Sequence, residues 1–282
     1  MIIDAHQHFW DPTHADYPWM DAPELAPIRR AFAPADLAPL LKANGIDASI
    51  LVQCRSALAE TEQFLRIARD TPFVAGVVGW VDLTDGWVGE TLDRLRVMRG
   101  GDKLIGIRHQ VHDEPDPDWL LREDVRRGLT AVFAHDLAYD FLVRTRELPA
   151  AIATARAFPH ARFVLDHAAK PPIADGWSPE WADHIAALAA CGNVWCKISG
   201  LATEAAWNDW DAERLFRFVE HAAKCFGEDR LIFGSDWPVC LLAGSYGEIK
   251  SALETCLAKL GPQARDKAFG VNAKAAYRLA IV

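Results

Sequence analysis

Eight short apolar runs recur along the chain, and a helical pattern separates most of them. The runs cover residues 2–6, 48–53, 73–81, 104–111, 141–143, 162–165, 194–198 and 231–233. They are too apolar to have one face in water, so we interpret them as strands buried on both faces. Strict alternation of such strands with helices implies parallel strands joined by crossover helices. The pattern therefore predicts an α/β fold built on a parallel sheet.

Helical segments are predicted at residues 34–42, 57–69, 85–98, 122–134, 149–157, 179–190, 211–226, 246–260 and 272–279. Eight strand–helix units of about 35 residues each match a (β/α)8 TIM-like barrel, which is usually about 250 residues long. The alternative, a doubly wound open sheet, lacks support because no G-x-G-x-x-G or P-loop motif follows a strand. Without a linker or internal repeat, residues 1–282 are predicted to form a single domain.

Composition narrows the class of partner. The formal net charge is −9, and basic residues gather in pairs only, which argues against nucleic acid or an acidic membrane surface as a partner. No run approaches the roughly 18 apolar residues of a membrane span. The N-terminal residues do not resemble a signal peptide, and the six cysteines form no C-x-x-C motif. We expect a cytoplasmic protein with reduced thiols. The sequence leaves open whether the protein forms a homo-oligomer.

The segment 9–32 breaks the regular alternation. It holds four prolines together with Trp10 and Trp19, and it directly follows the first predicted strand. In a barrel, that end of the strand lies on the face where active sites are built. A long loop in this place is more often a lid or a pocket wall than a disordered insert. We therefore expect this segment to border a binding pocket.

Polar residues follow three of the predicted strands at that face. His6 and His8 end the first strand, and alternation points both side chains the same way, so they are candidates to share a divalent metal. The alternative is a pair of hydrogen-bonded polar residues. His167 ends the sixth strand and is suited to proton exchange near neutral pH, unless it is a core histidine. Asp236 follows the eighth strand and is a candidate base or metal ligand.

Two cationic side chains lie in or at the end of other strands. Arg108 ends the fourth strand, where an arginine suits a carboxylate or a polar carbonyl of a substrate, or else forms a structural ion pair. Lys197 lies inside the seventh strand, a costly place for a lysine unless it points into a polar barrel mouth. It is predicted to be either a site residue or a partnered structural charge.

Taken together, these motifs resemble the amidohydrolase superfamily. The resemblance rests on His-x-His at 6–8, the histidine at 167 and Gly-Ser-Asp-Trp-Pro at 234–238. The segments 106–109, 165–171 and 197–200 are similar to those of the sugar-lactonase branch, which includes fuconolactonases and rhamnonolactonases. Binuclear members carry a lysine on strand four, and many mononuclear members carry a histidine on strand five. This chain has neither residue there.

The resemblance implies hydrolysis of a sugar lactone, a small-molecule substrate, to its aldonic acid. Asp236 would take a proton from water, assisted by His167, His6 and His8. One divalent metal, zinc in the first instance, would bind His6, His8 and Asp236, although lactonases of this branch can act without metal. Arg108, Lys197, Trp237 and Trp10 are predicted to bind substrate. The alternatives are a pyrone or aromatic dicarboxylate lactonase, a metal-dependent decarboxylase, and a non-catalytic sugar-acid binding protein.

Overall fold

A computed structural model describes residues 1–280 as a barrel of eight parallel strands in chain order, which confirms the predicted (β/α)8 class. Each strand pairs in parallel with the next from β1 to β8. The strands are β1 (Ile3–Gln7), β2 (Ala48–Val52), β3 (Val74–Gly79), β4 (Leu104–His109), β5 (Ala138–Phe141), β6 (Phe163–Leu165), β7 (Val194–Ile198) and β8 (Leu231–Phe233). All eight are almost entirely buried, as expected for a parallel sheet covered by helices.

The barrel closes between β1 and the segment after β8. Gln7 and Trp237 form a parallel bridge across this seam. The Asp236 N–H donates to the His6 carbonyl oxygen at 2.8 Å, and the His8 N–H donates to the Trp237 carbonyl oxygen at 2.8 Å. The first and last strands thereby meet at the end of the barrel that carries the predicted site.

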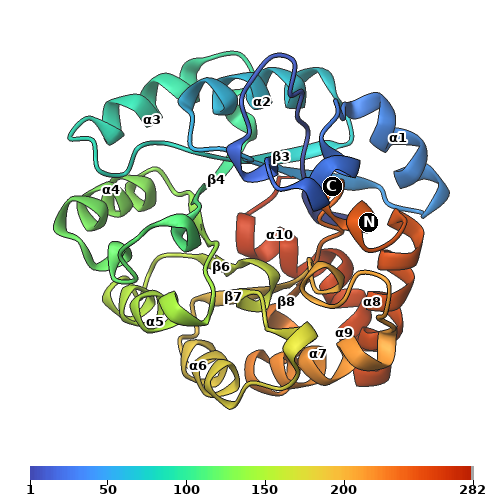
Figure 1. The fold of residues 1–282 in the computed structure, drawn as a ribbon. Helices are drawn as coiled ribbons and strands as arrows, with labels where there is room; N and C mark the ends of the chain where they lie inside the picture. The colour runs from blue at the N-terminus through green and yellow to red at the C-terminus, as the bar shows by residue number, and fades with distance from the viewer. Residues whose placement is uncertain (281–282) are drawn as a thin grey trace.

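Helices surround the strands, as Figure 1 shows. They are α1 (Pro34–Ala43), α2 (Leu58–Asp70), α3 (Val88–Val97), α4 (Glu123–Ala134), α5 (Leu148–Ala157), α6 (Pro179–Ala189), α7 (Ala212–Phe226), α8 (Tyr246–Leu260), α9 (Pro262–Asp266) and α10 (Asn272–Tyr277). Local sequence sets several of these bounds. The Asp211 side chain caps α7, Ser245 and Glu248 form a capping box at α8, and Gly227 and Gly261 end these two helices with positive φ.

The fifth strand was predicted in the wrong place. The apolar run at 141–143 suggested a strand there, whereas β5 covers Ala138–Phe141 and contains Asp140. The carboxylate of Asp140 interrupts the apolar pattern, so the prediction from hydrophobicity placed the strand after this residue. Asp140 is tolerated inside the barrel because Lys197 and Tyr277 bind it. The short helix α9 was not predicted either.

The C-terminal helix α10 lies within the ring of helices in Figure 1 and packs on the barrel interior. Its side chains share one apolar cluster with inward-facing residues of six strands. That cluster holds Ile3, Ala5, Ala48, Ile50, Val52, Val78, Ala138, Val164, Ile232, Ala273, Ala276 and Tyr277. A second, larger cluster fills the space between the strands and the outer helices. The barrel interior is therefore apolar near α10 and polar toward the other end.

The segment 9–32 contains two short 3-10 helices, Pro18–Met20 and Pro23–Ile28. Trp10 and Phe32 bridge its two ends in antiparallel fashion, so the segment folds back on itself and its inner side chains pack on the barrel. Within residues 1–280, no helix combines the length and the apolar character needed to cross a bilayer.

Close packing between α4 and the segment after β3 makes one glycine position intolerant of a side chain. A methyl group on Gly128 would lie 2.2 Å from the Leu83 carbonyl oxygen, whereas one on Gly89 in α3 meets nothing within 4 Å. We predict that Gly128→Ala lowers the free energy of unfolding by about 1–3 kcal/mol. Gly89→Ala is the matched control and is expected to be neutral or stabilising by up to about 1 kcal/mol. Chemical denaturation of both variants checks this, and equal stabilities would contradict the packing.

Candidate active site

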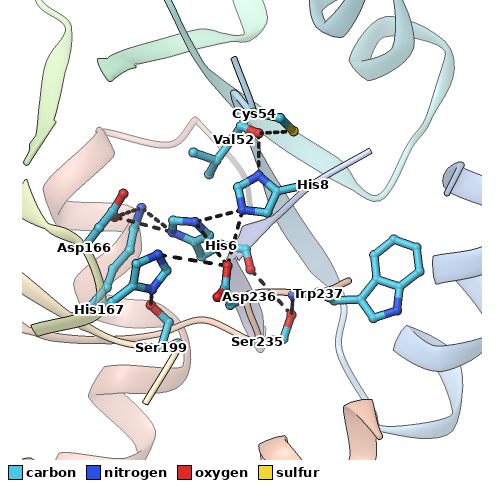
Figure 2. A network of polar contacts seen from close by, with 12 residues as sticks. His6, His8, Val52, Cys54, Asp166, His167, Ser199, Ser235, Asp236 and Trp237 are labelled. Carbon is cyan, nitrogen blue, oxygen red and sulfur yellow. Dashed lines mark hydrogen bonds and ion pairs between the residues drawn. The ribbon is translucent and has the colours of Figure 1, made fainter. Parts of the chain in front are cut away.

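Three of the predicted site residues meet at the seam that closes the barrel. His6 lies in β1, His8 directly follows it, and Asp236 comes shortly after β8. The His6 and His8 Nε2 atoms are 3.2 Å apart. The Asp236 Oδ1 atom lies 3.3 Å from His8 Nε2 and 3.7 Å from His6 Nε2. Figure 2 shows the three side chains pointing toward one another, so the prediction that both histidines face the same way is confirmed.

A register shift in β1 turns His6 toward the barrel interior. Ile3 and Ala5 belong to the interior cluster, and strict alternation would then point His6 outward. The pairing with β2 shifts register between Asp4 and Gln7. Such a bulge re-aims the side chains beyond it, and it brings His6 to the same side as Ala5.

The His8 ring is oriented by the neighbouring strand β2. Its Nδ1 lies 2.8 Å from the Val52 carbonyl oxygen. A carbonyl oxygen only accepts hydrogen bonds, so the Nδ1 nitrogen carries the hydrogen and donates it. The other nitrogen, Nε2, is left facing the site. This is the arrangement found at many histidines that bind metals, where a carbonyl fixes the tautomer.

The protonation of His6 follows from its partners on both sides of the ring. Arg108 Nη1 lies 3.2 Å from His6 Nε2, and a guanidinium can only donate, so Nε2 accepts. The hydrogen of the neutral ring then sits on Nδ1, which is 3.4 Å from Asp166 Oδ1. Lys197 Nζ also lies 3.3 Å from Nδ1, but its shorter contacts with Asp140 and Asp166 direct its N–H groups to those carboxylates. Burial lowers the pKa of the His6 imidazole well below its ordinary value, although Asp166 opposes this effect. His6 is therefore a neutral imidazole with its Nε2 lone pair in the site.

His167 reaches the site from the turn after β6, whose backbone conformation is unusual. Residues 167–170 all have positive φ angles, between 48° and 61°. The turn places His167 Nδ1 2.9 Å from the Ser199 hydroxyl oxygen and Nε2 4.0 Å from Asp236 Oδ1. A methyl group on Gly200 would lie only 2.6 Å from His167 Nδ1. The glycine is thus required for the ring to reach this position.

Asp236 is a carboxylate among neutral imidazoles. Burial by itself would raise its pKa, but the interactions with the imidazoles of His167 and His8 outweigh burial, and the pKa lies below its ordinary value. Burial also lowers the pKa of His167 well below the usual histidine value. At neutral pH the site therefore holds an ionised Asp236 facing the uncharged His6 and His167, an arrangement suited to removing a proton from water.

Lys197 lies beneath the site, and its predicted contact with substrate does not fit this place. The side chain is fully buried and does not line the cavity. Its Nζ atom lies 2.6 Å from Asp140 Oδ2, 2.9 Å from Asp166 Oδ1 and 3.3 Å from His6 Nδ1. Tyr277 of α10 also donates to Asp140 Oδ2, at 2.6 Å. The other prediction for Lys197, a partnered structural charge, agrees with the structure.

Arg108 forms the structural ion pair that was one of its two predicted roles, and its contact with substrate stays a prediction. It borders the cavity, and it forms a buried ion pair with Asp166 at 2.8 Å. Gln53 accepts further hydrogen bonds from the same guanidinium. Together with Lys197, Arg108 neutralises the two buried carboxylates under His6, which a protein interior requires.

A cavity of about 140 Å³ opens above these groups. Its walls include apolar side chains from several loops, Trp10, Trp19, Cys54, Leu142 and Val239. Polar side chains form the rest, namely His8, Arg108, Gln110, His112, Asp113, His167, Lys170 and Asp236. Trp10 and Trp19 come from the segment 9–32, so the prediction that this segment forms a pocket wall is confirmed.

Trp237, by contrast, was predicted to contact substrate and does not. The side chain is 1% exposed and packs against Phe9 and Phe32, with ring centroids 6.2 Å and 5.3 Å away. In Figure 2 it points away from Asp236 and the histidines. The backbone turns at Asp236, which has a φ of 59°, so that Asp236 faces the site while Trp237 packs into the core.

The residues that hold the seam in place were not predicted from the sequence. Asp4 Oδ1 accepts the Ser235 N–H at 2.8 Å, and Asp4 Oδ2 accepts the Ser235 and Tyr246 hydroxyls at 2.6 Å and 2.9 Å. Asp140 in β5 was also missed. In both cases the available signal was a charged residue inside an apolar run, the same kind of signal that singled out Lys197.

The donor set at the seam fits a divalent metal. Zinc bonds of about 2.0–2.1 Å in a tetrahedron place neighbouring ligand atoms about 3.3 Å apart. The three separations among His6 Nε2, His8 Nε2 and Asp236 Oδ1 are 3.2, 3.3 and 3.7 Å. These atoms present lone pairs to one another, and a cation between them relieves that repulsion. One ligand atom each from His6, His167 and Asp236 also falls within 4.8 Å of the others.

Fold and site together define a barrel hydrolase of the His-x-His type, and a family comparison agrees. The family model described as Amidohydrolase matches residues 3–279, so this chain belongs to the amidohydrolase family. It is similar to a Burkholderia ambifaria protein named L-fucono-1,5-lactonase, with 43% identity over 281 residues, which is 98% of this chain and 95% of that protein.

Solved structures give the same assignment. A Burkholderia multivorans amidohydrolase, solved once with bound zinc and once with bound HEPES, has a TM-score of 0.93 to this chain in both forms. The identities are 39% and 38%, and each comparison covers 99% of both chains. A probable 2-pyrone-4,6-dicarboxylic acid hydrolase from Acinetobacter baumannii has a TM-score of 0.79 at 16% identity, covering 98% of this chain and 99% of that one. At that identity the likeness shows the fold alone.

The buried imidazoles generate a prediction about pH. Because burial lowers the pKa of His6 and His167 well below 6.5, both rings should stay neutral as the pH falls from 8 to about 5.5. Imidazole nitrogen NMR shifts of the labelled protein measure this directly. Free histidine in the same sample is the control and titrates near its ordinary pKa of about 6.5. A titration of either ring in that range would contradict the assigned neutral state.

Proposed function

We propose that this protein hydrolyses a sugar-derived 1,5-lactone of the L-fuconolactone type to the aldonic acid. The observation that carries the reaction is an ionised Asp236 at the floor of a cavity, facing neutral imidazoles. The substrate class comes from the relatives named L-fucono-1,5-lactonase. The cavity agrees with such a ring, since Trp10, Trp19 and Val239 offer apolar contact while Gln110 and Lys170 can bind hydroxyl groups.

The reaction begins with a water molecule between Asp236 and the lactone carbonyl carbon. Asp236 takes a proton from the water as its oxygen attacks that carbon, which forms a tetrahedral intermediate. When the intermediate collapses, the bond from the carbonyl carbon to the ring oxygen breaks. The proton held by Asp236 passes to the departing ring oxygen, which becomes the hydroxyl group of the open-chain acid. Asp236 returns to its ionised form.

His167 is placed to stabilise the oxyanion of the intermediate. The ring is neutral, and its Nε2 atom faces the Asp236 carboxylate. Because a carboxylate only accepts, this orientation favours the hydrogen on Nε2, with the Ser199 hydroxyl donating to Nδ1. An N–H held beside Asp236 in this way can also donate to the substrate oxyanion, and it then stabilises the developing negative charge.

His6, His8 and Asp236 would hold a divalent metal, with zinc as the first candidate. When bound, the metal supplies Lewis-acid polarisation of the carbonyl oxygen or of water. Val52 fixes the His8 ring for this role through Nδ1, and Asp166 fixes the His6 ring.

Replacing the proposed base tests its role. We predict that Asp236→Asn lowers kcat by about a hundredfold to ten-thousandfold, because an amide cannot take the proton from water. The fold should be retained, since the amide keeps the size of the side chain. Asp209→Asn changes an exposed carboxylate that does not line the cavity; it is the control and should behave as wild type. Near-normal turnover by Asp236→Asn would exclude it as the base.

A lactone panel tests the substrate class. Acid release would be followed with a pH indicator on L-fucono-, galactono-, arabinono- and rhamnono-lactones and on 2-pyrone-4,6-dicarboxylate, each with and without a chelator. We expect L-fuconolactone to be turned over with the highest kcat/KM. Turnover of the pyrone alone would show that the protein is a dicarboxylate lactonase instead. Binding without turnover would favour a sugar-acid binding protein.

A further inference from the structure

The Arg108 guanidinium has a hydrogen-bond partner for each of its five N–H groups. Nε and one N–H of Nη2 donate to Gln53 Oε1, at 3.1 and 2.9 Å, and the other N–H of Nη2 donates to the Gln53 carbonyl oxygen. Nη1 donates to Asp166 Oδ2 at 2.8 Å and to His6 Nε2 at 3.2 Å. The side chain is nearly buried. Arg108 is therefore locked in the orientation that reaches His6.

The bond to His6 uses the atom that a metal would need. A neutral imidazole has one hydrogen and one lone pair on its two ring nitrogens. In His6 the hydrogen is on Nδ1, directed to Asp166, and the lone pair is on Nε2. That lone pair can accept the Arg108 N–H or bind a cation, but it cannot do both.

We propose that Arg108 competes with a divalent metal for the Nε2 lone pair of His6, so that the guanidinium weakens metal binding at the seam. This inference rests on the metal ligands proposed above, His6, His8 and Asp236. In the metal-free state the Arg108 N–H satisfies His6, and metal entry requires that this hydrogen bond be given up. Arg108 thereby lowers the fraction of sites that hold metal at a given free metal concentration.

The charges around His6 also weaken metal binding at the seam. Lys197 and Arg108 bring two positive charges within hydrogen-bond distance of the two nitrogens of His6. The carboxylates of Asp140 and Asp166 are paired with these cations. Among the groups around His6 within residues 1–280, Asp236 is the one carboxylate left to offset the charge of a metal. A site built to hold zinc tightly gains from uncompensated anionic ligands, and this one offers a single carboxylate.

The test is zinc affinity, measured without substrate by competition with a chromophoric chelator. Arg108→Gln removes the competing donor to His6 and one positive charge. We expect its zinc dissociation constant to fall by about tenfold or more relative to wild type, the scale expected for releasing a charged hydrogen bond. Arg144→Gln also removes a positive charge, but Arg144 pairs with Glu204 rather than with His6. It should change the zinc affinity little.

Two further measurements show whether the added zinc affinity arises at the seam. They also keep the proposal testable if Arg108→Gln does not fold. The double variant His8→Ala/Arg108→Gln should lose the added affinity if the zinc is bound at the seam. In wild-type protein, imidazole nitrogen NMR should show His6 Nε2 without a hydrogen, and zinc should shift that signal. A protonated Nε2 would overturn the proposal even if Arg108→Gln does not fold. Equal or weaker zinc binding by a folded Arg108→Gln would overturn it as well.

Lactone hydrolysis is assayed in parallel and answers a separate question. Failure to turn over any lactone would contradict the proposed function while leaving the zinc result intact. Conversely, a lactonase whose zinc affinity does not respond to Arg108→Gln would keep its function and lose this inference.

Discussion

Closure of the barrel between its first and last strands is the constraint on which the site depends. Two backbone hydrogen bonds cross that seam, from Asp236 N–H to the His6 carbonyl and from His8 N–H to the Trp237 carbonyl. The residues that make these bonds include the three whose side chains meet in the site. Any change that opens the seam therefore separates the carboxylate from its imidazoles, and Asp4 ties both sides together from behind.

Beneath the seam lies a second constraint, the neutralisation of buried charge. Lys197 and Arg108 balance Asp140 and Asp166 inside the barrel, and Tyr277 connects this network to the C-terminal helix. Breaking such a network by removing one member leaves an unpaired buried charge, which costs far more than an exposed pair contributes. The network also fixes His6, so the same residues serve stability and the chemistry of the site.

The sequence predicted the fold class and brought His6, His8, His167 and Asp236 to one place, because parallel strands end at the same face of a barrel. It failed where a residue's partners lie far along the chain. Lys197 and Trp237 were expected to contact substrate, yet one pairs with carboxylates from β5 and from the end of β6, and the other packs against the segment 9–32.

The sequence by itself determined the alternation of strands and helices and the residue types at the strand ends, because both are local patterns of hydrophobicity and chemistry. Only the tertiary structure decided which nitrogen of each histidine faces the site, since Val52, Asp166 and Arg108 fix this from other strands and from the end of β6. It also decided that Asp140 lies within a strand. The role of a charged residue in an apolar run depends on its partner, here Lys197, which the fold brings beside it.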